Sequence, residues 1–327
     1  METPIVVLGY SAAPSPLPGA WPTTHRALLP VCGKPIVVHQ LEHLARAGYR
    51  HVRLGRCASQ AALRRRLGDG REWGVTLRYS DLPAQELCQE TLIVSGGCLT
   101  TQADALLTGP LPAADSLEPK YWEADTPLPG NSCIHHLHDD GDVATLPVGA
   151  PVDCATPLDY HELNLGVLRG NVDCVVPGRP MHGFNAIADW KTRVSDRAFV
   201  GRDVFLGKHV LIDADARLEG ECILSNGVVV GSGVRLRNVT VLPNTHVLPD
   251  SRFENAVLGP NGMFSLAAPA GPAPRLEPSD ALAESRDAQV TTGLPRSLRQ
   301  ARPAGNSFAK IFPCPREIQV STASRGD

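Results

Sequence analysis

The densest group of potential metal ligands in this 327-residue sequence falls in one short stretch, which holds His135, His136, His138, Asp139 and Asp140. Imidazole and carboxylate groups of this kind bind zinc and related metals. Ligands that are adjacent in a loop rarely converge on one ion, however, and no second cluster elsewhere in the sequence complements this one. We therefore predict a solvated turn here rather than a metal centre.

Cysteines and arginines give two further candidates for chemistry. The nine cysteines are scattered and form no C-x-x-C pair, which indicates neither a disulfide framework nor a zinc knuckle. The run Arg64 to Arg66 carries enough positive charge to meet a phosphate, but a charged run on a short helix is usually its solvated face. We predict the solvated face.

An aliphatic residue recurs every six positions between Val194 and Phe253. These positions are Val194, Val200, Leu206, Ile212, Leu218, Leu224, Val230, Leu236, Leu242 and Leu248. Small or branched residues follow four positions after most of them, namely Ala198, Val204, Val210, Ala216, Cys222, Val228, Val234 and Thr240, until His246 and Arg252 break the set. A period of six fits neither an amphipathic helix nor an alternating strand, so it predicts a parallel β-helix of stacked hexapeptides.

The repeat also bears on assembly and activity. One coil cannot bury its own core, so coils must stack, and such prisms often associate side by side, which predicts a homo-oligomer and specifically a trimer. The repeat resembles the left-handed β-helix family, whose members are often acyltransferases with a histidine base. That likeness makes His209 and His246 candidate bases, with His246 at a predicted corner of the prism. Only about three coils are visible and no long loop interrupts them, so a structural or surface role is favoured for both histidines.

The composition limits the class of protein. With 43% hydrophobic residues and a net charge of -3, the chain is long enough for two domains and a tail, and a dedicated nucleic-acid binder is disfavoured. The chain does not open with a basic-then-apolar signal sequence, and no apolar run approaches the roughly 20 residues that span a bilayer. We expect a cytoplasmic protein without a membrane span.

The N-terminal half alternates between strand and helix patterns. Residues 4–9, 49–54, 74–79 and 92–95 are predicted as strands, and residues 36–47 and 60–67 as helices. Such alternation is typical of a doubly wound parallel sheet, which binds ligands at the carboxyl ends of its strands.

Three stretches of this half resemble the sugar-1-phosphate nucleotidyltransferases. They are R-A-L-L-P-V-C-G-K-P from Arg26 to Pro35, E-W-G-V-T-L-R-Y-S from Glu72 to Ser80, and V-D-C-A-T-P-L-D-Y-H-E-L-N from Val152 to Asn164. They occur in the family's order, and a β-helix after the third is also a family arrangement. P-G-R at Pro177 to Arg179 and V-L-P-N-T-H-V around Pro243 are similar to members of the exopolysaccharide-synthesis type.

The resemblance implies a site in which several parts are changed. The family's glycine-rich phosphate loop corresponds to Tyr10 to Pro18, which has no glycine or arginine and holds three prolines that lack N–H donors. The family's catalytic lysine corresponds to Arg26, and substrate contacts correspond to Lys34 and Gly96. Of two aspartates that hold Mg²⁺ in the family, Asp153 is retained and Gly97 stands in the other position, so one carboxylate would bind the ion weakly.

We therefore expect an α/β fold: a truncated doubly wound, Rossmann-like nucleotidyltransferase domain followed by a left-handed parallel β-helix. The expected ranges are residues 1–170 for the α/β domain, 171–190 for a linker, 191–263 for the β-helix and 264–327 for a disordered tail. The expected function is a catalytically impaired binding or scaffolding subunit of nucleotide-sugar or exopolysaccharide metabolism, with nucleotide, nucleotide-sugar or polysaccharide-synthesis proteins as partners. The alternatives are an active sugar-1-phosphate nucleotidyltransferase that uses Mg²⁺, and an acyltransferase.

Overall fold

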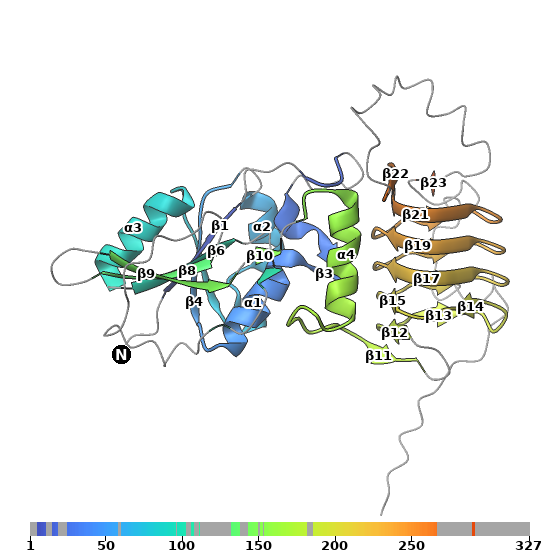
Figure 1. Cartoon of the computed structure of the whole chain (residues 1–327), viewed down its shortest axis with the longest axis horizontal. Helices are drawn as coiled ribbons and strands as arrows, with labels where there is room; N and C mark the ends of the chain where they lie inside the picture. Colours follow the sequence, from blue (N-terminus) through green and yellow to red (C-terminus); the bar gives the residue numbers. More distant parts are fainter. Residues whose placement is uncertain are drawn as a thin grey trace, which may run out of the picture.

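The structure is a computed structural model with two bodies, an N-terminal α/β body and a C-terminal stack of coils, joined by helix α4 (Pro157–Leu168) (Figure 1). It describes residues 5–10, 15–18, 25–57, 60–95, 97–102, 106–107, 111, 132–137, 143–149, 151–152, 154–181, 186–266 and 290–291. No helix within these ranges is long and apolar enough to cross a membrane.

The α/β body is built on a six-stranded sheet. Its strands in spatial order are β5 (Thr76–Tyr79), β4 (His51–Leu54), β1 (Ile5–Gly9), β6 (Gly97–Gln102), β8 (Ser132–Leu137) and β9 (Val143–Gly149). The first four run parallel and the last two are antiparallel. The β8–β9 hairpin lies in a stretch whose sequence shows little periodicity, so sequence patterns gave no indication of it.

Helices cover both faces of this sheet. On one face α1 (Ile36–Arg46) and α2 (Gln60–Leu67) pack their apolar residues onto Val6, Leu8, Val52 and Leu54. On the other face Leu87 of α3 (Ala84–Ser95) packs against Val7 and Cys98. The predicted helix at residues 60–67 is confirmed, and the predicted helix at residues 36–47 ends one residue early.

The predicted strand at residues 92–95 is wrong, because these residues form the last turn of α3. Strand β6 follows it and pairs in parallel with β1, so that Ile5 lies opposite Cys98 and Gly9 opposite Gln102. The apolar run Leu92-Ile93-Val94 has strand-like composition. A run this short does not distinguish a buried strand from a buried helix segment.

Short elements complete the α/β body. They are the 3-10 helices η1 (Arg26–Leu28) and η2 (Arg71–Trp73), and the strand pairs β2 (Pro30–Val31) with β3 (Lys34–Pro35) and β7 (Leu106–Leu107) with β10 (Pro151–Val152). The β2–β3 turn consists of Cys32 and Gly33, both with positive φ (42° and 80°). Asn226 of the C-terminal body donates a hydrogen bond to the Gly33 carbonyl at 3.0 Å. The hairpin therefore rests on the coils.

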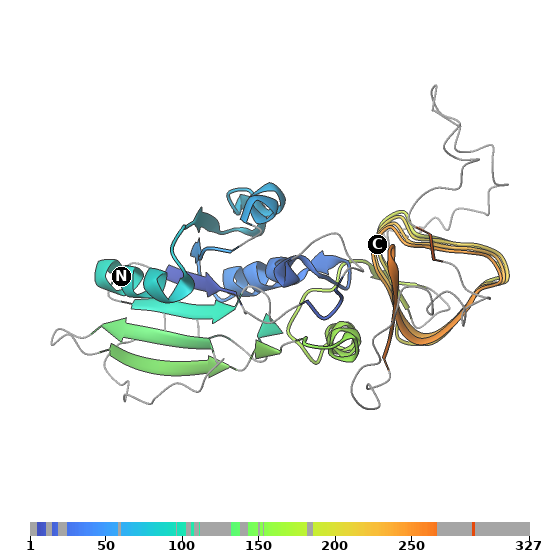
Figure 2. The same ribbon diagram turned by 90° about the horizontal axis from the view of Figure 1, so that it is seen from above.

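The C-terminal body is a parallel β-solenoid of about four turns. Seen from above, its coils superimpose (Figure 2). Its strands are β11 (Arg179–Pro180), β12 (Ala186–Ala188), β13 (Arg193–Val194), β14 (Phe199–Val200), β15 (Val204–Leu206), β16 (Leu211–Ile212), β17 (Arg217–Leu224), β18 (Val229–Val230), β19 (Arg235–Val241), β20 (His246–Val247), β21 (Arg252–Gly259), β22 (Gly262–Ser265) and β23 (Val290–Thr291).

The first parallel pairing of the solenoid, β12 with β15, falls inside the segment expected to be a linker. Strand β22 runs two residues past the expected end of the β-helix and pairs antiparallel with β21. The estimate of three coils from sequence is therefore one too few. Residues 267–289 and 292–327, most of the expected tail, lie outside the described part of the chain.

The coil length changes halfway up the solenoid. Ala186 pairs with Val204 and Val204 with Cys222, a spacing of 18 residues. Cys222 pairs with Val239 and Val239 with Ala256, a spacing of 17. The shorter coil lacks one residue at the corner formed by Asn238, which has φ 51°. The six-residue register of the sequence therefore ends at this corner.

Beyond that corner every interior position is one residue earlier than predicted. The interior aliphatic positions are Val241 and Val247 instead of Leu242 and Leu248, and Phe253 follows them. The small corner positions are Val239, Thr245 and Ser251, which are buried, instead of Thr240, His246 and Arg252. The prediction that His246 occupies a corner is thus wrong. The small-residue set only appears to break at His246, because the loss of one residue from the coil moves each corner position one residue earlier.

One outward-facing column of the solenoid is apolar and is covered by α4. Ile187, Phe205, Ile223, Thr240 and Val257 pair in register on successive coils, and the last four have no exposed side-chain surface. They share a core with α4 and with the β2–β3 hairpin. Residues on nearly every side of α4 are buried because the helix lies between the two bodies.

Several polar groups buried at this junction form hydrogen bonds. The Tyr160 hydroxyl donates to the Pro30 carbonyl, and the Asn164 side chain accepts from the Cys32 amide at 2.9 Å. On the solenoid side His161 Nδ1 lies 2.7 Å from the hydroxyl of Thr240, the polar member of the apolar column. Burial, together with the nearby Arg169, lowers the pKa of His161 to about 4, so the imidazole is neutral at pH 7.

Candidate functional site

The carboxyl ends of the four parallel strands form the edge at which an α/β sheet normally binds ligands. Two glycines allow α3 to begin directly at this edge. A Cβ atom on Gly9, at the end of β1, would lie 3.0 Å from the Ala84 Cβ, and one on Gly55, after β4, would lie 3.1 Å from the Ala84 nitrogen. The first turn of α3 and the ends of β1 and β4 are therefore in close contact.

Arg26 is brought to this edge by the residues around it. The Tyr10 ring, directly after β1, packs edge-on against His25 with 4.6 Å between ring centroids. His25 Nδ1 in turn accepts a hydrogen bond from the Ala27 amide at 3.2 Å and caps η1. The contact places η1, and with it Arg26, beside the end of β1.

The Arg26 side chain points into the protein. Only 3% of it is exposed, and its Nη2 donates to the Cys154 carbonyl at 3.0 Å. Cys154 directly follows Asp153, which lies outside the described residues. The structure thus brings Arg26 to the segment that contains the retained aspartate, as part of a buried tie between η1 and the start of α4.

Lys34 is committed to an ion pair. Its Nζ lies 2.6 Å from Glu42 Oε2 on α1, and the two side chains are 17% and 26% exposed. A lysine that neutralises a bound phosphate must offer its ammonium group to the ligand. In this structure the ammonium is already neutralised by Glu42.

Gly97 lies at the edge of the sheet opposite to the carboxyl ends of the parallel strands. It begins β6, so it lies at the amino-end edge of the sheet, whereas Gln102, the last residue of β6, lies beside Gly9 at the carboxyl edge. The structure therefore does not bring Gly97 to the carboxyl edge, because the expected strand at residues 92–95 is the end of α3, and the identification of Gly97 as a replaced metal ligand stays a prediction. Gly96 lies outside the described residues.

The β7–β10 pair connects the chain after β6 with the chain before α4. Val152 of β10 lies opposite Leu106 of β7. Asp153 comes directly after Val152, and Asp104 comes two residues after the end of β6 and two before Leu106.

The signal that would have found β6 from sequence is the β-branched pair Thr100 and Thr101, set off from the apolar run by two glycines.

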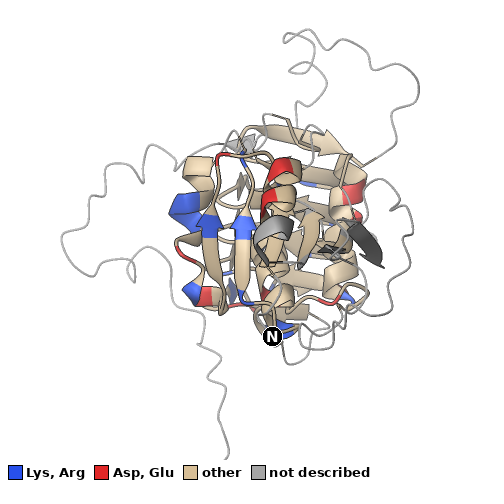
Figure 3. Ribbon diagram, turned by 90° about the vertical axis from the view of Figure 1, so that its left-hand side faces the viewer, with Lys and Arg blue, Asp and Glu red and all other residues tan. Residues whose placement is uncertain are grey.

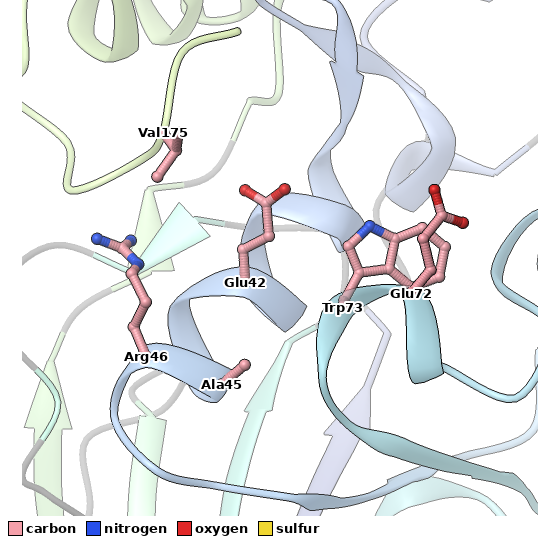
Figure 4. Close-up of a pocket in the computed structure, with 6 residues that line it drawn as sticks. All are labelled: Glu42, Ala45, Arg46, Glu72, Trp73 and Val175. Atoms are coloured by element: carbon pink, nitrogen blue, oxygen red, sulfur yellow. The ribbon is translucent and has the colours of Figure 1, made fainter.

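One hollow on the described surface lies away from this edge. It has a volume of about 440 Å³ and is lined by Glu42, Ala45, Arg46, Glu72, Trp73 and Val175 (Figure 4). These residues come from the second half of α1, from η2 and from the segment after α4. The hollow lies near the amino ends of β4 and β5, and it includes no residue that the sequence analysis proposed for a site.

The two histidines of the acyltransferase alternative lie on different coils. His209 is exposed at a corner, with φ 57°, and its ring lies edge-on to Trp190 at 5.7 Å between centroids. His246 is half-buried in β20, which is separated from the β16 coil by β18. The structure does not bring the two residues together, and the acyltransferase alternative stays a prediction.

Arginines gather on the β4–α2–β5 side of the α/β body, as the blue strands and helix of Figure 3 show. Arg64, Arg65 and Arg66 are exposed, in agreement with the predicted solvated face. Arg64 lies over the Tyr79 ring at 4.8 Å and Arg66 over the Trp73 ring at 5.8 Å. Aromatic contacts of this kind hold the guanidinium groups in place at the surface.

Among the residues that the structure describes, no group of three or more His, Cys, Asp or Glu side chains gathers as a metal site. The predicted turn at His135 and His136 is wrong, because both belong to strand β8. His138, Asp139 and Asp140 lie outside the described residues.

Comparisons with known proteins do not add a family. No protein-family model matches the chain, and no curated protein matches it.

Proposed function

We propose that this chain is a nucleotidyltransferase-like protein of nucleotide-sugar or exopolysaccharide metabolism that is impaired in catalysis and acts as a binding or scaffolding subunit. Three sequence motifs in the family's order, a parallel sheet with helices on both faces and a solenoid after the third motif support this assignment. The truncated Rossmann-like character of the α/β body is part of the proposal.

The burial of Arg26 is the main observation in favour of impaired catalysis. The residue at this position would have to contact the transferring phosphate, yet its guanidinium group lies inside the protein on the Cys154 carbonyl. Withdrawing it would leave that carbonyl without this bond and cost about 1–3 kcal/mol. Lys34, the second cation of the motif, is held by Glu42.

An active transferase is the second candidate, and the position of β6 favours it. With Gly97 at the opposite edge, one argument for a missing metal ligand is removed. The acidic residues that follow β6 and β10 in the sequence are Asp104 and Asp153. Two carboxylates and waters suit Mg²⁺, which would shield the charge of the transferring phosphate.

Calorimetric titration of the full chain with nucleoside triphosphates and nucleotide-sugars, with and without Mg²⁺, tests the first proposal. Binding without pyrophosphate release from any pairing of nucleotide and sugar-1-phosphate is the expected result. Pyrophosphate release that disappears in Asp104→Asn and Asp153→Asn, but not in the exposed control Asp81→Asn, would establish the active alternative instead. If no nucleotide or nucleotide-sugar binds, the ligand-binding role and the active transferase are both wrong.

The assembly is a separate proposal. We propose that the coils are left-handed and that the protein is a homo-oligomer, with a trimer as the specific expectation. Exposed apolar side chains on the solenoid, among them Trp190 (63% exposed) and Phe199 (52% exposed), support association of copies. Light scattering coupled to size exclusion measures the mass directly, and a monomer at micromolar concentration would contradict the proposal.

A further inference from the structure

Two cysteines from different elements meet beneath α3. Cys88 lies on α3 and Cys98 on β6, and their sulfur atoms are 3.2 Å apart. Cys98 has no exposed surface, whereas Cys88 is half-buried and can be reached from solvent. The two residues share a small apolar cluster with Val7 and Leu87, so packing on both sides holds them together.

The separation suits covalent closure. A disulfide has a sulfur–sulfur distance of about 2.05 Å, so the two sulfurs must approach by about 1 Å, which rotation of the side chains and a small shift of α3 can supply. The thiols already interact, and the hydrogen bond from Cys98 lowers the pKa of Cys88. The same bond, together with burial, raises the pKa of Cys98. Cys88 is thus the more readily ionised and the more accessible sulfur of the pair.

We propose that Cys88 and Cys98 form an oxidation site that reacts with hydrogen peroxide and closes to an intramolecular disulfide. The Cys88 thiolate attacks a peroxide oxygen and is oxidised to the sulfenic acid as the oxygen–oxygen bond breaks, and the leaving oxygen takes up a proton and departs as water. The Cys98 sulfur then attacks the Cys88 sulfur and gives up its proton. The sulfur–oxygen bond breaks, and a second water leaves.

The disulfide would fasten α3 to the strand beside β1. The first turn of α3 contacts Gly9 and Gly55 at the carboxyl edge, so oxidation would fix one wall of that edge. The site does not depend on nucleotidyl transfer and is open to test whether or not that proposal holds.

Peptide mapping of the full-length protein after treatment with hydrogen peroxide tests the inference. Cleavage after Glu90 separates the two cysteines, which share one tryptic peptide because no Lys or Arg lies between Tyr79 and Pro119. The expected product is a pair of linked peptides, with both cysteines protected from alkylation and released by a reducing agent. The half-buried Cys57 should remain open to alkylation in the same sample.

Serine variants provide the controls. Cys98→Ser should still be oxidised at Cys88, but only to the sulfenic acid, which a dimedone-type reagent traps, while Cys88→Ser should give no linked peptide. Cys57→Ser, matched in exposure, should form the link as the unaltered chain does. Circular dichroism confirms that each variant is folded. A link from Cys88 to Cys133 instead, or failure of peroxide to join Cys88 to Cys98 in the folded protein, would overturn the inference.

Discussion

His161 should make the junction between the two bodies sensitive to acid. Its pKa is lowered from 6.5 to about 4 in the folded protein, first by burial and then by the charge of Arg169. In the unfolded chain the ring is solvated and takes up a proton near pH 6.5. As the pH falls from about 6.5 to about 4 the unfolded state therefore binds more protons, and stability is lost. Proton linkage lowers the free energy of unfolding, relative to its value above pH 6.5, by about 2 kcal/mol at about pH 5. The decrease reaches about 3 kcal/mol once His161 is protonated in both the folded and the unfolded state.

The variant His161→Asn isolates this contribution, because asparagine keeps a polar atom near Thr240 and does not titrate. Urea unfolding of both proteins at about pH 8 and about pH 5 gives the free-energy difference between them at each pH. The unaltered protein should lose about 2 kcal/mol relative to the variant on acidification. His51→Asn, at an exposed position, serves as the control and should show no such change. A difference between the unaltered protein and His161→Asn that stays constant with pH would refute the reasoning.

Four substitutions test the fold. Leu236→Ala, inside the solenoid, should lower the free energy of unfolding by about 2–5 kcal/mol. Leu248 is half-buried, although the six-residue register places it inside the solenoid, so Leu248→Ala should lower the free energy of unfolding by only about 1 kcal/mol. If urea denaturation gave the same loss for Leu248→Ala as for Leu236→Ala, the shift in register would be contradicted. Asn226→Asp removes the 3.0 Å hydrogen bond to the Gly33 carbonyl and should speed amide hydrogen exchange in the β2–β3 hairpin. Thr156→Ala removes the side-chain cap of α4 and should cost about 1 kcal/mol, measured by thermal unfolding.

The solenoid could be predicted from sequence because its period is carried by many residues. Its upper coils show the limit of that reasoning. Leu242 and Leu248 are aliphatic and continue the count of six, although they lie one residue past the interior positions Val241 and Val247. Leu242 is buried against α4, so a hydrophobic pattern cannot distinguish it from an interior residue. Only the strand register shows that the coil has lost a residue.

The candidate site could be predicted in part. The motif around Arg26 was visible, but its buried direction depends on Cys154, which is 128 residues away in the sequence. Gly97 was expected at the carboxyl edge because the apolar end of α3 was interpreted as the strand. Contacts between distant segments and the choice between a short strand and a helix end are both set by packing, which local patterns do not record.

The apolar column on the outside of the solenoid restricts how this chain could have been assembled by gene fusion. A fragment beginning at residue 171 would present Phe205, Ile223 and Val257 to water, and a fragment ending at residue 155 would leave the hydrophobic side of the β2–β3 hairpin bare. Recombination could replace one body by a homologue only if α4 were transferred together with that body. The transferred helix would also have to pack against the remaining body. The sequence of α4 therefore determines which pairs of bodies can be combined in one folded chain.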